Sequence, residues 1–290
     1  MSRDLARTAF GQTFQNPVLL AAGTAGFGRE VSGVIDLERL GGIITKAVSR
    51  EARAGNRAPR VAEFAFGMLN SVGLANPGLA RVREEQLPWL AANLRQARTL
   101  VNVVGFEAEH FAEVVAGLDD FSSITAFEIN LSCPNTSAGG LEFGADPTTA
   151  ARVIELCRGR TRKPLVAKLS PALPDIAGMA LAVRDAGADG VSVVNTLPGY
   201  LATEHGTPRL GNGNGGVSGP ALLPTGVLAV RRIMERSGGM PVIGMGGIRS
   251  GDDARQYLRA GATLVAIGTA AMANPRVPER IVADLEEHGG

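Results

Sequence analysis

Short apolar runs recur along the chain, and amphipathic stretches separate most of them. The runs are Val18–Ala22, Ile43–Ala47, Leu100–Gly105, Ala126–Asn130, Leu165–Leu169, Val191–Asn195, Val242–Gly246 and Leu264–Gly268. Runs of this length without alternation are typical of strands buried on both faces of a parallel sheet. Apolar residues at helical spacing, with charged residues on the other face, occupy Glu107–Leu118, Thr148–Arg158, Asp175–Ala186, Leu223–Arg236 and Asp252–Ala260. The pattern predicts a (β/α)8 TIM barrel, and we expect residues 1–290 to form one domain.

Two irregular stretches, Ser49–Arg83 and Leu197–Pro220, follow directly after predicted strands. Active sites of (β/α)8 barrels form at the carboxyl ends of the strands, so we expect these inserts to build a pocket or a lid on that face. Within the first insert, the apolar stretch Val61–Leu69 is either a hairpin that faces a partner or simple loop packing. Exposed apolar patches alone do not separate these two interpretations.

Composition excludes several classes of protein. The net charge is +1 without a basic stripe, which argues against nucleic-acid binding. No apolar run reaches the roughly 18 residues that a membrane span needs. The two cysteines, Cys133 and Cys157, favour a reducing compartment, and we expect a cytoplasmic protein. Since no Cys/His cluster has zinc spacing, we expect no metal site, and Cys157 fits a small core residue of a helix.

Polar residues lie within or at the ends of five successive predicted strands. These residues are Lys46, Asn102, Asn130, Lys168 and the pair Asn195-Thr196. An unpaired ammonium is costly to bury, so a lysine within an apolar run indicates a specific role. The alternatives are surface lysines beside misplaced strand ends, and asparagines that satisfy a turn or the core. Together the positions predict one polar cavity at the mouth of the barrel.

The last predicted strands end in glycine. Gly216-Val217-Ser218-Gly219-Pro220 precedes a helix, Gly244-Met245-Gly246-Gly247-Ile248 closes the seventh strand, and Gly268-Thr269 closes the eighth. Barrels of this class often bind phosphate between the loops after strands seven and eight, where glycines let the backbone approach the anion. The alternative is that these glycines only serve tight turns. We expect a phosphate-bearing cofactor here, with Lys168 near a conjugated ring whose reduced, negative form it would stabilise.

The segment Asn130-Leu131-Ser132-Cys133-Pro134-Asn135 places a thiol between amide side chains at a strand end. Amides pair with imide or amide edges of planar ligands, and a thiol can act as a general base. The alternative is an ordinary turn, because Asn, Ser and Pro are common turn residues.

These motifs together resemble a known family. Asn70-Ser71-Val72-Gly73-Leu74-Ala75-Asn76-Pro77-Gly78, the Asn130–Asn135 segment and the glycine motifs resemble class 1 dihydroorotate dehydrogenase, from Asn16 to Pro275. The resemblance implies a barrel with one FMN per chain that oxidises dihydroorotate to orotate in pyrimidine biosynthesis. It implies that Cys133 removes the C5 proton while hydride passes from C6 to the flavin N5.

The resemblance also assigns binding residues. Those implied for the substrate are Lys46, Asn70, Ser71, Val72, Gly73, Leu74, Asn130, Asn135, Asn195 and Thr196. Those implied for FMN are Ala22, Gly23, Lys46, Ala47, Asn102, Asn130, Lys168, Val194, Gly219, Gly246, Gly247, Gly268 and Thr269.

The segment Val194-Asn195-Thr196-Leu197-Pro198-Gly199 resembles subtype 1B. That subtype implies a homodimer of catalytic subunits within a heterotetramer, whose partner subunit holds FAD and a [2Fe–2S] cluster and passes electrons to NAD+. Two cysteines are too few for such a cluster, which takes about four ligands. The alternatives are a fumarate-linked class 1A enzyme, a dihydropyrimidine dehydrogenase-like or IMP dehydrogenase-like barrel, and a scaffold that binds a phosphate ligand.

Two segments depart from the family pattern. The family often has Ala-Ser-Gly where this chain has Ala21-Ala22-Gly23, so a side-chain contact to FMN would be absent there. The loop Tyr200–Gly215 is also unusual, which leaves its lid contacts and partner surface open.

Overall fold

The computed structural model describes residues 4–132, 134–135 and 141–289. Its strands are β1 (Arg7–Ala9), β2 (Gln12–Phe14), β3 (Val18–Leu20), β4 (Gly42–Ile44), β5 (Val61–Phe64), β6 (Gly67–Asn70), β7 (Arg98–Val103), β8 (Ile124–Asn130), β9 (Pro134–Asn135), β10 (Leu141–Glu142), β11 (Leu165–Leu169), β12 (Gly190–Val193), β13 (Leu197–Gly199), β14 (Gly215–Ser218), β15 (Val242–Met245) and β16 (Leu264–Ile267). Its α-helices are α1 (Gly78–Arg81), α2 (Leu87–Asn93), α3 (Ala108–Leu118), α4 (Pro147–Arg158), α5 (Ile176–Asp185), α6 (Leu223–Ser237), α7 (Gly251–Arg259), α8 (Thr269–Ala273) and α9 (Val277–His288). Short 3₁₀ turns are η1 (Leu37–Arg39), η3 (Phe143–Ala145) and η4 (Pro220–Leu222), and η2 (Val82–Gln86) is π-helical.

Eight of the described strands close into a parallel barrel in the order β3-β4-β7-β8-β11-β12-β15-β16. Each of the apolar runs contributes one of these strands, so the predicted (β/α)8 barrel is confirmed. The strands are buried on both faces, which explains why their sequences do not alternate. The strand register pairs Asn102 with Glu128, and Lys168 with both Asn130 and Ser192.

The helices α3, α4, α5, α6 and α7 occupy the predicted amphipathic stretches. Helix α4 begins at Pro147 behind the N-cap Asp146, whose carboxylate accepts from Thr149 N–H at 2.8 Å. The first unit differs, because among described residues only η1 lies between β3 and β4. No described helix is long and apolar enough to cross a membrane.

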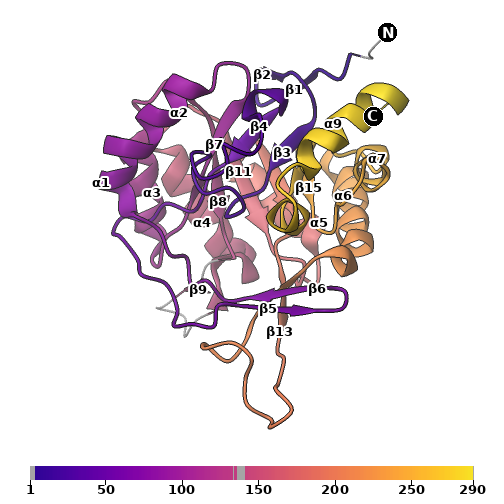
Figure 1. Cartoon of the computed structure of the whole chain (residues 1–290). Helices are drawn as coiled ribbons and strands as arrows, with labels where there is room; N and C mark the ends of the chain where they lie inside the picture. Colours follow the sequence, from indigo (N-terminus) through magenta and orange to yellow (C-terminus); the bar gives the residue numbers. More distant parts are fainter. Residues whose placement is uncertain (1–3, 133, 136–140, 290) are drawn as a thin grey trace.

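The two inserts combine into one antiparallel sheet with the strand order β13-β14-β6-β5. Strand β6 pairs with both its hairpin partner β5 and β14, where Asn70 lies opposite Gly216. Figure 1 shows this sheet beyond one end of the barrel, with the segment between β13 and β14 projecting away from it. The hairpin at Val61–Leu69 is thus confirmed, and its turn residue Phe66 is 71% exposed, while a partner facing it stays a prediction.

Two apolar clusters hold the barrel together. The larger lies between strands and helices, and a second combines inward-facing residues such as Leu100, Val166 and Ile243 with Phe10 and Phe14. The hairpin β1–β2 that supplies these phenylalanines lies at the end of the barrel opposite the inserted sheet (Figure 1). One end of the barrel is therefore plugged by apolar side chains, which leaves the carboxyl end of the strands for a site.

Candidate active site at the barrel mouth

A buried polar cluster lies inside the barrel on four adjacent strands. Asn102 on β7, Lys168 on β11 and Ser192 on β12 all meet Glu128 of β8. The Glu128 carboxylate accepts hydrogen bonds from Asn102 Nδ2 at 2.5 Å and from Ser192 Oγ at 2.7 Å, and Lys168 Nζ lies 3.6 Å from it. The predicted burial of Lys168 and Asn102 is confirmed, at 5% and 0% exposure.

Glu128 and Ser192 were not among the predicted site residues. Both lie within predicted strands, and Glu128 interrupts the apolar run Ala126–Asn130. The argument applied to Lys168 also applies to a carboxylate, because a buried charge needs a partner. A buried lysine in one strand and a buried glutamate in the next were therefore a detectable signal.

The predicted asparagines come together around Ser132. Asn195 Nδ2 donates to Ser132 Oγ, which in turn donates to Asn130 Oδ1 at 2.8 Å. Thr196, next to Asn195, packs against Gly216 so closely that a Cβ at Gly216 would overlap its hydroxyl.

Asn70 reaches the same place from the inserted sheet. Its Nδ2 donates to the Gly216 carbonyl at 3.2 Å, and all these side chains are half-buried or buried at the mouth. Ser132 thus joins two of the four predicted substrate asparagines, and Asn70 bonds Gly216, against which Thr196 packs.

The segment Ser71–Leu74 is held by two further asparagines. Asn56 Nδ2 donates to Ser71 Oγ at 2.8 Å, and the Asn56 N–H donates to the Val72 carbonyl at 3.1 Å. Asn76 is 6% exposed, and its side chain bonds Ser49 and the Leu74 carbonyl. The backbone of this segment is therefore fixed at the edge of the mouth, as binding of a small ligand requires.

Glycines shape the opposite half of the mouth. Gly219, Gly246 and Gly247 have φ angles of +111°, +114° and +76°. A Cβ at Gly247 would lie 2.5 Å from the Leu223 nitrogen at the start of α6. Only glycine fits such positions without strain. Backbone N–H groups near a helix start, at the recurring phosphate position of these barrels, suit an anion.

Two side chains stabilise this glycine half. Tyr257 Oη of α7 lies 2.9 Å from the Met245 carbonyl and 2.7 Å from the Gly246 carbonyl, to which it donates. Thr269 Oγ1 donates to Ser218 Oγ at 2.8 Å, which links the loop after β16 to the end of β14. Burial raises the pKa of Tyr257, so its hydroxyl stays protonated and keeps donating.

The remaining predicted residues lie around the same mouth with fewer described contacts. Ala22 and Gly23 follow β3, Lys46 and Ala47 follow β4, Val194 follows β12, and Gly268 follows β16. The described contacts of Lys46 are those of its backbone, whose N–H donates to the Gly26 carbonyl at 2.7 Å. Cys133 lies outside the described residues, and for Asn135 only the backbone position in β9 is described.

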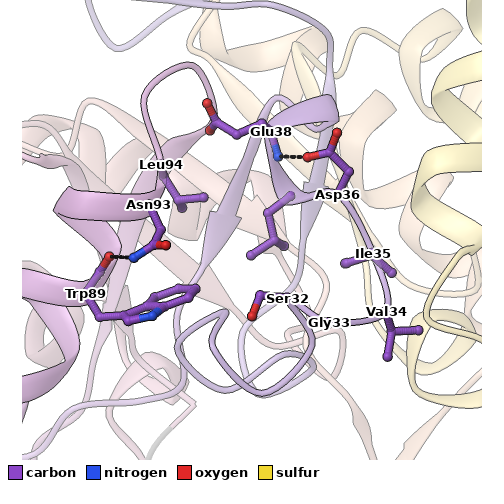
Figure 2. Close-up of a pocket in the computed structure, with 10 residues that line it drawn as sticks. Ser32, Gly33, Val34, Ile35, Asp36, Glu38, Trp89, Asn93 and Leu94 are labelled. Carbon is purple, nitrogen blue, oxygen red and sulfur yellow. Dashed lines mark hydrogen bonds between the residues drawn. The ribbon is translucent and has the colours of Figure 1, made fainter.

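A separate cavity of about 570 Å³ lies beside the barrel, between residues 32–38 and α2 (Figure 2). Its polar groups already serve local structure, since Asp36 accepts from Glu38 N–H and Asn93 donates to the Trp89 carbonyl. The Glu38 carboxylate accepts from three successive backbone N–H groups at residues 95–97. None of the predicted site residues lines this cavity, so it does not compete with the barrel mouth as the active site.

Comparison with known proteins identifies the family. The family model for dihydroorotate dehydrogenase matches residues 4–288. The chain is 44% identical over 278 residues to a Geobacillus kaustophilus protein named dihydroorotate dehydrogenase B (NAD(+)), catalytic subunit, covering 95% of this chain and 87% of that protein. It is 41% identical to a Pelobacter propionicus protein of the same name, covering 100% and 96%. A crystal structure of DHODH from Eimeria tenella in complex with ferulenol superposes with a TM-score of 0.81 at 24% identity, covering 97% of this chain and 83% of that chain.

The closed barrel and the family comparison together define a (β/α)8-barrel oxidoreductase. The chain belongs to the dihydroorotate dehydrogenase family. Membership confirms the family resemblance, while the roles of individual residues stay predictions.

Proposed function

We propose that this protein oxidises dihydroorotate to orotate in pyrimidine biosynthesis, with FMN as its cofactor. The observation that carries the proposal is the arrangement of amides at the mouth. Ser132 joins Asn130 of β8 to Asn195 after β12, and Asn70 of β6 bonds the Gly216 carbonyl. A buried lysine–glutamate pair lies on β8 and β11 of the same barrel. The curated relatives named for this activity align over nearly the whole chain.

The residues present fit FMN. Asn102 Oδ1 is buried without a partner among the described residues, and so offers an unused acceptor to a ring N–H. The cofactor residues assigned by the resemblance divide into Lys46, Asn102 and Lys168 for the ring and Gly246, Gly247, Gly268 and Thr269 for the phosphate. FMN, when bound, supplies the acceptor for the hydride that leaves C6 of dihydroorotate.

The substrate would lie between the asparagines. Asn70, Asn130 and Asn195 present amides, which can both donate to carbonyl oxygens and accept from ring N–H groups of a pyrimidine, and the resemblance adds Asn135 to this set. The backbone of Ser71–Leu74 and the Lys46 ammonium would bind the carboxylate side. Holding the ring in one orientation is the main catalytic contribution of such groups.

Cys133 would be the base that takes the C5 proton. Loss of this proton and of the C6 hydride leaves the C5–C6 double bond of orotate, so the reaction balances with one two-electron acceptor. We expect Cys133→Ser to slow anaerobic flavin reduction by about 10²-fold or more at neutral pH, because an alcohol is far less readily deprotonated than a thiol. Unchanged stopped-flow reduction in that variant would exclude the role, with Cys157→Ser as the control.

The electrons would leave through a partner subunit with FAD and a [2Fe–2S] cluster, on to NAD+, in a heterotetramer built on a homodimer of this chain. The printed names of the relatives, which specify a catalytic subunit and NAD(+), support this arrangement. The two cysteines of this chain are too few to hold the cluster.

The deciding experiment is anaerobic mixing of the FMN-loaded protein with dihydroorotate, followed by the loss of visible flavin absorbance. Rapid bleaching with dihydroorotate but not with dihydrouracil is expected. Bleaching by dihydrouracil alone would favour a dihydropyrimidine dehydrogenase-like activity. Reoxidation by fumarate, rather than by NAD+ with the partner subunit, would favour class 1A.

A further inference from the structure

The Glu128 carboxylate is fully buried and meets groups from three other strands of the barrel. Its partners are the Asn102 amide nitrogen, the Ser192 hydroxyl and the Lys168 ammonium, at 2.5, 2.7 and 3.6 Å. All three present hydrogens to it, which suits the ionised carboxylate, an acceptor only. A charge at this depth is tolerated only when it is paired and hydrogen-bonded.

The carboxylate also fixes the orientation of Asn102. Because the amide nitrogen points at Glu128, the oxygen Oδ1 points elsewhere and has no partner among the described residues. A buried acceptor without a donor is unfavourable, so a ligand is expected to supply the donor. Glu128 thereby decides that Asn102 offers a ligand its oxygen rather than its nitrogen.

Glu128 itself lies one layer below Asn130 and is as deeply buried as Asn102, and both asparagines are assigned to the ligands. On the inward face of β8 it precedes Asn130 by two residues, and inward positions alternate along a strand. Its exposure is 0%, whereas Asn130 and Lys168 retain 9% and 5%. An influence on a bound ring would therefore pass through Lys168 and Asn102.

We propose that Glu128 is a positioning residue that holds the Lys168 ammonium and the Asn102 oxygen toward the FMN ring and offsets the lysine charge there. The proposal rests on the proposed function in so far as it requires bound FMN. With Glu128 in place, the pair presents little net charge, so the reduction potential of the flavin stays low. Without it, an uncompensated ammonium would favour the negative reduced ring and raise that potential.

A double-mutant cycle with Glu128→Gln and Lys168→Met tests the proposal. Glu128→Gln is expected to increase the ratio of reduced to oxidised flavin about tenfold at a fixed ambient potential, which is about 30 mV for a two-electron couple. In the Lys168→Met background, Glu128→Gln should change the ratio of reduced to oxidised flavin by less than about twofold. An unpaired buried carboxylate takes up a proton, so the substitution then replaces one neutral side chain with another. Such non-additivity identifies action through Lys168, whereas a merely structural role gives equal shifts in both backgrounds.

The measurement is dye-equilibrated reduction of the FMN-loaded proteins, followed by their visible spectra. Ser192→Ala is the matched control, because it removes one hydrogen bond to Glu128 and leaves both charges; its potential should equal that of the unaltered protein. An unchanged potential in Glu128→Gln, or equal shifts in both backgrounds, would overturn the proposal.

Two further results keep the test decisive. If Glu128→Gln fails to fold, Lys168→Met and the double variant are compared alone. Equal flavin potentials in these two variants, with a higher urea midpoint for the double variant than for Lys168→Met, support the pairing of Glu128 with Lys168. Any other result overturns it. Reduction by a dye needs no substrate, so a protein that dihydroorotate fails to reduce would contradict only the proposed activity. A protein that never binds FMN would overturn both the proposed activity and the role of Glu128.

Discussion

The barrel interior has two unlike walls near the carboxyl ends of its strands. On adjacent strands β7, β8, β11 and β12 the inward residues include Asn102, Glu128, Lys168 and Ser192. On the other four strands the corresponding residues are apolar: Met245 on β15, Ala266 on β16, Ile44 on β4, and Ala21 directly after β3. The polar wall offers side chains, and the loops beyond the apolar wall offer backbone at glycines.

Under the proposed function, the difference between the two walls separates two tasks. A planar ring whose charge changes during reaction needs oriented charges and amides, which only side chains supply. A phosphate with constant charge is bound well by fixed backbone N–H groups. Substitutions of the charged residues Glu128 and Lys168 on the polar wall should therefore alter the electrostatics of the site, and those on the glycine half should alter anchoring of the cofactor.

The largest expected effect comes from breaking the polar wall. Glu128→Ala leaves the Lys168 ammonium buried without its counter-ion, and we expect the free energy of unfolding to fall by about 3–5 kcal/mol. Urea denaturation monitored by circular dichroism measures it. Ser192→Ala should cost only about 1 kcal/mol. Equal losses in the two variants would contradict the view that the ion pair is the centre of this wall.

The glycine half is tested by Gly247→Ala. Its φ of +76° and the 2.5 Å approach of a Cβ to the Leu223 nitrogen force the loop to move. The strain, about 1–3 kcal/mol, should weaken FMN binding by roughly 10–100-fold in a fluorescence titration.

Gly238→Ala is the matched control for that substitution. Gly238 caps α6 with a φ of +66° and open space around its Cβ position. The Gly238→Ala protein should therefore be somewhat less stable than the unaltered protein but should bind FMN with the same affinity. Equal weakening by both variants would show that the glycine loop does not bind the phosphate.

Tyr257→Phe sharpens the comparison within the glycine half. The substitution removes the donor to the Gly246 carbonyl, and we expect a loss of about 1 kcal/mol in unfolding free energy. Burial raises the pKa of Tyr257 above its value of about 10 in the unfolded chain, so the folded state keeps a proton that the unfolded chain loses. Its contribution to stability is constant below about pH 10 and falls at higher pH. Urea midpoints measured between pH 8 and 11 should therefore fall more steeply in the unaltered protein than in Tyr257→Phe, in which the raised pKa of Cys157 still contributes a fall.

The smallest effect is expected at Cys157, outside both walls. Burial raises the pKa of its thiol to about 12, and its exposure is 0%. We expect no alkylation of Cys157 by iodoacetamide in the native protein at pH 8, and complete alkylation in urea, as read by peptide mass spectrometry. Rapid native labelling would mean that the helix α4 opens readily.

Much of the fold was predictable because it depends on local patterns. Buried parallel strands are apolar throughout, and helices α3 to α7 repeat their apolar residues at helical spacing, so both are visible in short windows. The hairpin β1–β2 was missed, since Phe10 and Phe14 match no periodic pattern and become meaningful only against the interior of the barrel.

The candidate site was predictable only in part. Lys168, Asn102 and Asn130 stood out because polar groups are unexpected within buried strands. Ser132 and Ser192 did not, because serine is small and common at both turns and strand ends, and its role depends on which side chain it meets.

The sequence by itself determined the alternation of strands and helices, the polar strand ends and the glycine loops, because each depends on residues close in the chain. Only the tertiary structure decided that β6 pairs with β14, which brings Asn70 to Gly216 across 146 residues. It also decided that Glu128 meets Asn102, Lys168 and Ser192. Contacts between distant segments have no periodic trace in the sequence, because they are selected by the closure of the barrel and by the free energy of pairing buried charges.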